Sequence, residues 1–192
     1  MSTELESLLE ELIGGDDDRA ELATAGIASM GQVALPALQP LLESRDVDAR
    51  WWALRTLAQM DEPPLEWLIQ GLKDESAEVR QCSALGICHH PTERAVDDLL
   101  ALLQDVEPVS SNLAASALIR IGKAATQDLL DKLDTLKGTG RIEAMRALAT
   151  LEDTRAISAL MAGTEEDSLL VNHWAEEGLK RLGLDMVYLQ PD

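Results

Sequence analysis

The small and apolar residues of this chain recur with the period of an α-helix, and the whole pattern repeats every 30 or 31 residues. Within residues 74–103, a first run of such positions ends at Pro91 and a shorter run follows to Leu103. This predicts two short helices joined by a turn. One such pair cannot bury its own apolar face, so it must stack on copies of itself. The pattern therefore predicts an all-α repeat protein.

Arg80 sets the register of the repeats when it is taken as position zero of its copy. The equivalent residues are Ala20, Arg50, Arg80, Ser111, Arg141 and Asn172. Three and six residues further on, every copy carries Ala, Ser, Thr or Gly; seven and ten residues on, every copy except that of His90 carries Leu, Ile or Met. Small residues let helix axes approach closely while the larger ones fill the seam, so these positions predict one buried face.

The same periodicity predicts the individual elements. A leucine-rich helix over residues 3–13 is expected to cover the N-terminal end. Second helices are expected over Leu35 to Leu42, Leu65 to Leu72, Val96 to Leu103, Thr126 to Leu133 and Ile157 to Met161. Pro40 should kink or fray the first of these. We expect a single domain over 1–192, with an N-terminal capping helix (1–15), repeats (16–183) and a short C-terminal cap (184–192).

The residues that carry the repeat resemble a known family. Asp74, Val79-Arg80, Leu85-Gly86 and Arg94-Ala95-Val96 are similar to HEAT repeats, in the short variety described as phycobilisome-lyase-type HEAT-like repeats. The resemblance covers residues 16–189 and implies a right-handed α-solenoid of about six HEAT-like helix-turn-helix repeats. In such arrays the second helices line the concave surface. The resemblance is specific for the fold and weak for function.

Composition and net charge indicate what kind of core and what kinds of partner to expect. Aromatic residues make up 3% of the chain and Phe is absent, so the core is expected to be Ala and Leu packing between helices. The formal net charge of −19 would repel a nucleic-acid backbone. The N-terminal stretch is acidic and amphipathic, which is unlike a signal peptide or a membrane span. We expect a cytoplasmic protein that binds a protein or peptide, and the acidic charge favours a basic partner. A homodimer through an apolar end is a further option.

No constellation of catalytic or metal-ligating residues stands out. His89 and His90 lie about three repeats away from His173, so a site of three histidines is not expected. Cys82 shares its column with Trp52 and Trp174, which favours buried core positions for all three over an activated thiol. The chain has no Gly-rich phosphate loop. We therefore expect no enzyme, no metal and no cofactor.

Trp67 is the most informative candidate for binding. Leu65, Leu68 and Leu72 form the buried stripe of its helix, which turns Trp67 outward, and exposed tryptophans are frequent in binding hot spots. The candidate binding residues on the concave face are Glu66, Trp67, Gln70, Asp97, Asp98, Gln127 and Asp131. They predict a non-catalytic interaction scaffold that binds a peptide or protein on this face.

Two other functions remain open from the sequence. The resemblance implies a bilin lyase-like subunit that helps to attach or remove a tetrapyrrole, although no residue is specific to pigment handling. The third possibility is a purely structural repeat that self-assembles through its ends.

Overall fold

The computed structural model describes residues 3–184, and within that range it contains helices, turns and no strand. The chain divides into two compact units, Met1–Thr92 (unit 1) and Glu93–Asp192 (unit 2). The division falls between the two helices of the third repeat. No helix among the described residues is long and apolar enough to cross a membrane. The predicted single domain stays a prediction, and the C-terminal cap expected after Leu184 lies outside the described residues.

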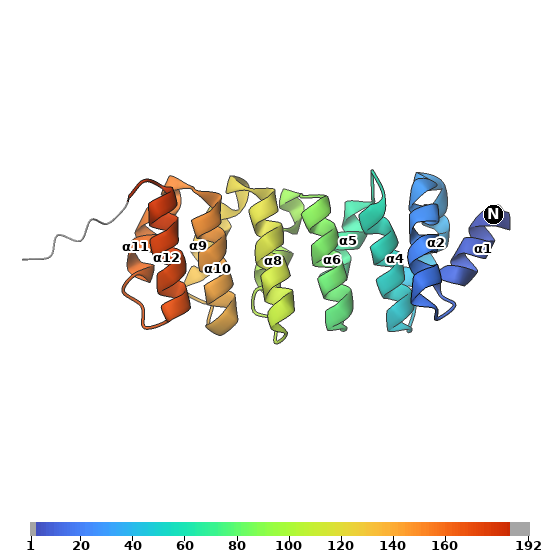
Figure 1. The fold of residues 1–192 in the computed structure, drawn as a ribbon, viewed down its shortest axis with the longest axis horizontal. Coiled ribbons are helices and arrows are strands. Elements are labelled where there is room, and N and C mark those ends of the chain that lie inside the picture. The colour runs from blue at the N-terminus through green and yellow to red at the C-terminus, as the bar shows by residue number, and fades with distance from the viewer. Residues whose placement is uncertain (1–2, 185–192) are drawn as a thin grey trace, which may run out of the picture. The chain divides into compact units, whose positions relative to one another are not determined.

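Unit 1 is built from helix pairs. Its helices are α1 (Thr3–Leu12), α2 (Asp17–Ser29), α3 (Leu35–Leu42), α4 (Val47–Gln59), α5 (Leu65–Gly71) and α6 (Ala77–His89). The first helices α2, α4 and α6 pack side by side, and α1 packs on α2 (Figure 1). The second helix α3 packs on α4, and α5 packs between α4 and α6.

Unit 2 repeats the same arrangement. Its helices are α7 (Val96–Leu102), α8 (Pro108–Ile121), α9 (Thr126–Leu133), α10 (Gly138–Leu151), α11 (Ile157–Gly163) and α12 (Leu169–Arg181). Here α10 packs between α8 and α12, while α7, α9 and α11 supply the second layer. Short 3-10 turns precede four second helices, at Gly31–Ala34, Glu93–Ala95, Lys123–Ala125 and Thr154–Ala156. The repeated helix pairs confirm the predicted all-α solenoid class.

The predicted buried face is confirmed. Ala53, Ser83 and Ala144, three residues after position zero, are fully buried. The small residues at the next position are required by close helix approach: a Cβ added at Gly86 would lie 2.8 Å from Leu68 Cδ2. His90, the exception in the apolar column, places its ring Nε2 at 3.1 Å from the Ala58 carbonyl oxygen and is satisfied by donating to it.

Two expectations need correction. The column two residues after position zero is not core throughout, because Leu22 is 75% exposed and Trp52 and Trp174 are only half-buried. Only Cys82 is buried there. This column lies about 100° around the helix from the buried column that follows it, so it falls at the edge of the packed face. Pro40 does not fray its helix, since α3 continues through it to Leu42.

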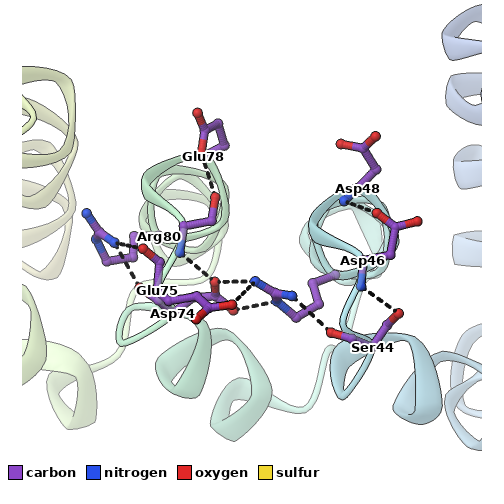
Figure 2. Close-up of polar contacts among 9 residues, drawn as sticks. Ser44, Asp46, Asp48, Asp74, Glu75, Glu78 and Arg80 are labelled. Atoms are coloured by element: carbon purple, nitrogen blue, oxygen red, sulfur yellow. Dashed lines mark hydrogen bonds and ion pairs between the residues drawn. The ribbon is translucent and has the colours of Figure 1, made fainter.

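The residues at position zero share a structural role, although they are not arginine in every copy. Arg50 Nη1 donates to the Ser44 carbonyl, and Arg80 Nη1 to that of Asp74. Figure 2 shows these loop residues at the starts of α4 and α6. In later copies Ser111 bonds the Leu103 carbonyl, Arg141 that of Leu133 and Asn172 that of Thr164. Different side chains thus satisfy carbonyls at the end of the preceding second helix or in the loop that follows it.

Candidate functional site

A hollow of about 420 Å³ opens between the second helices of unit 1, with part of α4 as its floor. We call it the second-helix hollow. It is lined by Gln39, Leu42, Glu43, Arg50, Leu54, Trp67, Gln70, Gly71, Lys73 and Asp74. Its size lies within the usual range for small-molecule sites, about 300–1,000 Å³. Apolar and polar groups therefore face one partly open space.

The packing of α5 places Trp67 in this hollow. Leu68 and Gly71 are buried on the core side of the helix, which leaves Trp67 half-buried and Gln70 exposed. A Cβ added at Gly71 would lie 2.0 Å from Ser83 Oγ and 2.9 Å from Leu54 Cδ1. The absence of a side chain at residue 71 therefore lets α5 approach both neighbouring first helices. The indole of Trp67 then lines the same hollow as Arg50 and Leu54 of α4.

An ion pair forms the polar part of the floor. Arg50 Nε and Nη2 each donate to a carboxylate oxygen of Asp74 at 2.8 Å. Burial raises the pKa of Asp74, but hydrogen bonds from Arg50 and from the Ser76 N–H outweigh it and hold the pKa below its usual value. Arg50 is only 6% exposed. The floor is a compensated, geometrically fixed pair, because two parallel bonds orient the guanidinium.

The predicted site residues fall in both units. Trp67 and Gln70 line the hollow, whereas Glu66 is exposed on the same helix. In unit 2, Asp97 on α7 is exposed and Asp98 is half-buried. Exposed Gln127 donates from Nε2 to Asp131 Oδ1 at 2.8 Å, along α9.

The structure adds Gln39, Glu43 and Lys73 to the lining, together with the Arg50 and Asp74 pair. No sequence signal singled out the first three as site residues. The sequence pattern identified Arg50 only as position zero of its repeat. A hollow depends on which side chains leave space between three helices, and the periodicity of a single helix does not contain that information.

A second hollow, of about 550 Å³, lies among the first helices of unit 1. We call it the first-helix hollow. It is lined by Asp17, Glu21, Val47, Asp48, Trp51, Trp52 and Glu78. The two indoles meet edge to face, with ring centroids 4.7 Å apart and planes at 90°. Trp51 is half-buried, like Trp52.

Cys82 is a core residue. Burial raises the pKa of its thiol to about 12, so almost no thiolate is present at neutral pH. Its sulfur lies 3.8 Å from the Trp51 carbonyl oxygen. Within residues 3–184, no group of three or more His, Cys, Asp or Glu side chains is arranged to hold a metal ion.

Comparison with family models finds two matches. A model for HEAT repeats matches residues 65–138, and one for the PBS lyase HEAT-like repeat matches residues 140–166. Together they cover most of the chain from α5 to α11.

Three curated relatives have names that refer to phycobilisomes, phycocyanobilin or phycocyanin. The chain is 34% identical over 111 residues to a phycobilisome maturation protein of Synechococcus elongatus, covering 56% of this chain and 53% of the relative. It is 29% identical over 89 residues to phycocyanobilin lyase subunit beta of a Nostoc species, covering 46% and 44%. The matches thus span about half the length of these two relatives. An uncharacterized phycocyanin operon protein of Pseudanabaena tenuis matches at 27% over 157 residues, covering 76% of this chain and 78% of the relative.

Solved structures give the same fold. The complex of CpcE and CpcF of phycocyanin lyase from a Nostoc species matches with a TM-score of 0.59 and 22% identity, over 74% of this chain and 96% of that chain. A designed armadillo repeat protein matches with a TM-score of 0.53 and 18% identity, over 93% of this chain and 99% of that chain.

These comparisons correct one expectation and confirm another. The expectation that the chain is not an enzyme is contradicted, because a sequence relative named as a phycocyanobilin lyase subunit points to lyase-related activity. The predicted repeat type is confirmed by both family models and by the fold. With its stacked helix pairs and its small-residue columns, this chain belongs to the HEAT-repeat family.

Proposed function

We propose that this chain is a subunit of a bilin lyase-type assembly and that it handles an open-chain tetrapyrrole. The observation that carries the proposal is the 34% identity, over 111 residues, to a phycobilisome maturation protein. The relative named as a phycocyanobilin lyase subunit supports it. These relatives favour the bilin-handling alternative over the peptide-binding scaffold that we first expected.

The second-helix hollow offers groups that suit a tetrapyrrole. The half-buried Trp67 indole supplies an aromatic surface for a flat pyrrole ring. Gln39 and Gln70 carry amides that both donate and accept, which matches pyrrole N–H groups and lactam carbonyls. The Lys73 ammonium lies at the same hollow and suits a propionate. An open-chain tetrapyrrole is large for this space, so we expect only part of it to be enclosed.

Protein partners follow from the same comparison. The solved phycocyanin lyase is a complex of two subunits, so we propose that this chain acts with a second subunit and with a protein that gains or loses the pigment. Cys82 is unsuited to carry the pigment itself, because its thiol is buried and protonated. The exposed second-helix residues Glu66, Asp97 and Asp131 remain proposed contacts for the protein partner. A cytoplasmic location stays a prediction.

The test is a visible-absorbance titration of phycocyanobilin with the purified chain. A pigment that is flexible in water becomes extended and rigid when it is held, so we expect a shifted and intensified long-wavelength band. Trp67→Ala should weaken the apparent affinity about tenfold while helicity by circular dichroism is unchanged. Trp174→Ala, a half-buried tryptophan of unit 2, is the matched control and should bind normally.

Two results would overturn the proposal. One is a spectrum that does not change with added pigment, either for the chain alone or with a co-purified second subunit. The other is equal weakening by Trp67→Ala and Trp174→Ala, which would indicate general adsorption of the pigment to apolar surface. Binding that is lost only with Trp67→Ala supports both the function and the site.

A further inference from the structure

We propose that the first-helix hollow is a docking site for a basic segment of a protein partner, with an arginine side chain seated between the two indoles and the surrounding carboxylates. The proposal concerns a different surface from the pigment site and stands independently of the pigment. It rests on three features of the hollow: its aromatic floor, two exposed acids, Asp17 and Asp48, that have no ion-pair partner among the described residues, and its position at the ends of three helices.

The aromatic floor is the first feature. Trp51 and Trp52 are adjacent on α4, line the same hollow of about 550 Å³ and remain half-buried. Their edge-to-face geometry presents one ring face at right angles to the other. A guanidinium stacks on a tryptophan face with a gain that grows when the group is partly desolvated. Such a corner suits one planar cation better than an extended apolar chain.

The charge around the indoles is the second feature. Four carboxylates line the hollow, and no Arg or Lys does. Arg55 Nη2 donates to Glu21 Oε1 at 2.6 Å, and Glu78 accepts from the Ser76 hydroxyl at 2.5 Å. Asp17 and Asp48 are exposed, and no cation among residues 3–184 forms an ion pair with either side chain. The hollow therefore offers carboxylate acceptors that a partner's guanidinium would complement.

The position of this hollow at the ends of three helices explains its acidic residues but not its two tryptophans. Asp17, Asp48 and Glu78 lie in the first turns of α2, α4 and α6, where negative charge is favourable. That accounts for the acids and offsets part of their charge. It does not account for two large indoles left half-buried between them. Exposed aromatic surface ringed by polar groups is typical of interaction sites.

Arginine fits this combination better than lysine. Its planar guanidinium stacks on a ring and still directs N–H groups sideways to carboxylates, whereas the ammonium of lysine is a compact, strongly hydrated charge. We therefore expect the partner to present an exposed arginine in a basic segment. The formal charge of −19 would speed the approach of such a segment, and the hollow would fix where it binds.

The test uses a fluorescein-labelled peptide of alternating glycine and arginine, measured by fluorescence anisotropy. Its isosteric counterpart contains citrulline, which keeps the shape and removes the charge. We expect the arginine peptide to bind at least about tenfold more tightly than the citrulline peptide. Trp51→Ala should weaken binding about tenfold, and Asp48→Asn about threefold.

The matched control is Asp128→Asn, which removes the same charge from an exposed position on α9 in unit 2. It should leave binding unchanged. Equal weakening by Asp48→Asn and Asp128→Asn would overturn the proposal, since it would show attraction to the overall charge. Equal binding of the citrulline peptide, or no binding of either peptide, would also overturn it. Because Asp48 is exposed, its variant keeps the test valid if Trp51→Ala fails to fold.

Discussion

Helix α4 contributes to both hollows of unit 1, and the two sets of side chains that it presents differ in how their charge is balanced. Arg50 and Leu54, four residues apart, share the face toward the second-helix hollow. Asp48, Trp51 and Trp52 share the face toward the first-helix hollow. In the first case Asp74 is paired with Arg50. In the second case Arg55 pairs with Glu21, whereas Asp17 and Asp48 take part in no ion pair found among residues 3–184.

This difference separates a structural role for charge from a role in binding. The Arg50 and Asp74 pair is part-buried, and Arg50 also donates to the Ser44 carbonyl, so the pair holds the loops in place. Asp48 is exposed and satisfies nothing comparable within the described residues. A tryptophan beside the paired floor suits a ligand of mixed polarity, whereas a tryptophan pair beside the exposed carboxylates of Asp17 and Asp48 suits a cation.

The largest effect should come from breaking the paired floor. Arg50→Ala leaves the Asp74 carboxylate largely buried without its partner, and we expect it to lower the free energy of unfolding by about 3 kcal/mol. Urea unfolding followed by circular dichroism measures this. The double variant with Arg50→Met and Asp74→Leu should recover part of the loss, because no unpaired charge remains. A single variant as stable as the parent would show that the pair is not structural.

The next prediction compares how substitutions of Trp67 and Trp51 change the affinity for each of the two ligands. Trp67→Ala should weaken pigment binding about tenfold and leave the arginine peptide unaffected, and Trp51→Ala should do the reverse. The substituted residues lie on different helices, α5 and α4, and line different hollows. Absorbance and anisotropy titrations of both variants measure the four affinities. If each variant weakened both ligands equally, a general loss of structure would be the cause.

A smaller difference should appear in how salt concentration changes ligand affinity at the two hollows. Raising sodium chloride from about 50 mM to about 500 mM shortens the screening length, so the arginine peptide should bind several-fold more weakly. The pigment, held mainly by an aromatic face and amides, should change less than about twofold. Parallel titrations at both salt concentrations measure the two responses. Pigment affinity that fell as steeply as peptide affinity would contradict the distinction.

The smallest effect concerns acid pH. The folded pKa of Asp74 lies below its unfolded value, which is about 3.9. Its contribution to stability is therefore present above pH about 4 and is lost as the pH falls through the folded pKa. The Asp74→Asn variant should be less stable than the parent near neutral pH, and the gap should narrow on acidification. Urea midpoints from pH about 6 to about 3 measure this. A constant gap would contradict it.

The sequence predicted the framework of this molecule well. The second helices expected over Leu35 to Leu42 and Thr126 to Leu133 have those bounds in the structure, because leucine periodicity and flanking turn residues define short helices locally. The small-residue columns predicted which positions are buried. Both properties depend on one helix and its nearest copies, which a repeat pattern contains.

The sequence did less well where three helices meet. Leu22, Cys82 and Trp52 occupy one column, yet one is exposed, one is buried and one lines a hollow. Edge positions depend on the size of neighbouring side chains, and no single periodicity specifies those. The position-zero column shows the opposite case: Arg50, Ser111 and Asn172 differ in chemistry, but each donates to a carbonyl just after the end of the preceding second helix.

The most direct test of the account follows the four indole N–H groups at once, by nuclear magnetic resonance of the protein labelled with nitrogen-15 tryptophan. Single substitutions assign the resonances. The account predicts that phycocyanobilin shifts the Trp67 signal and leaves Trp174 unchanged, and that the arginine peptide shifts Trp51 and Trp52 but not Trp67. A pigment that moved no indole, or that moved all four alike, would contradict it.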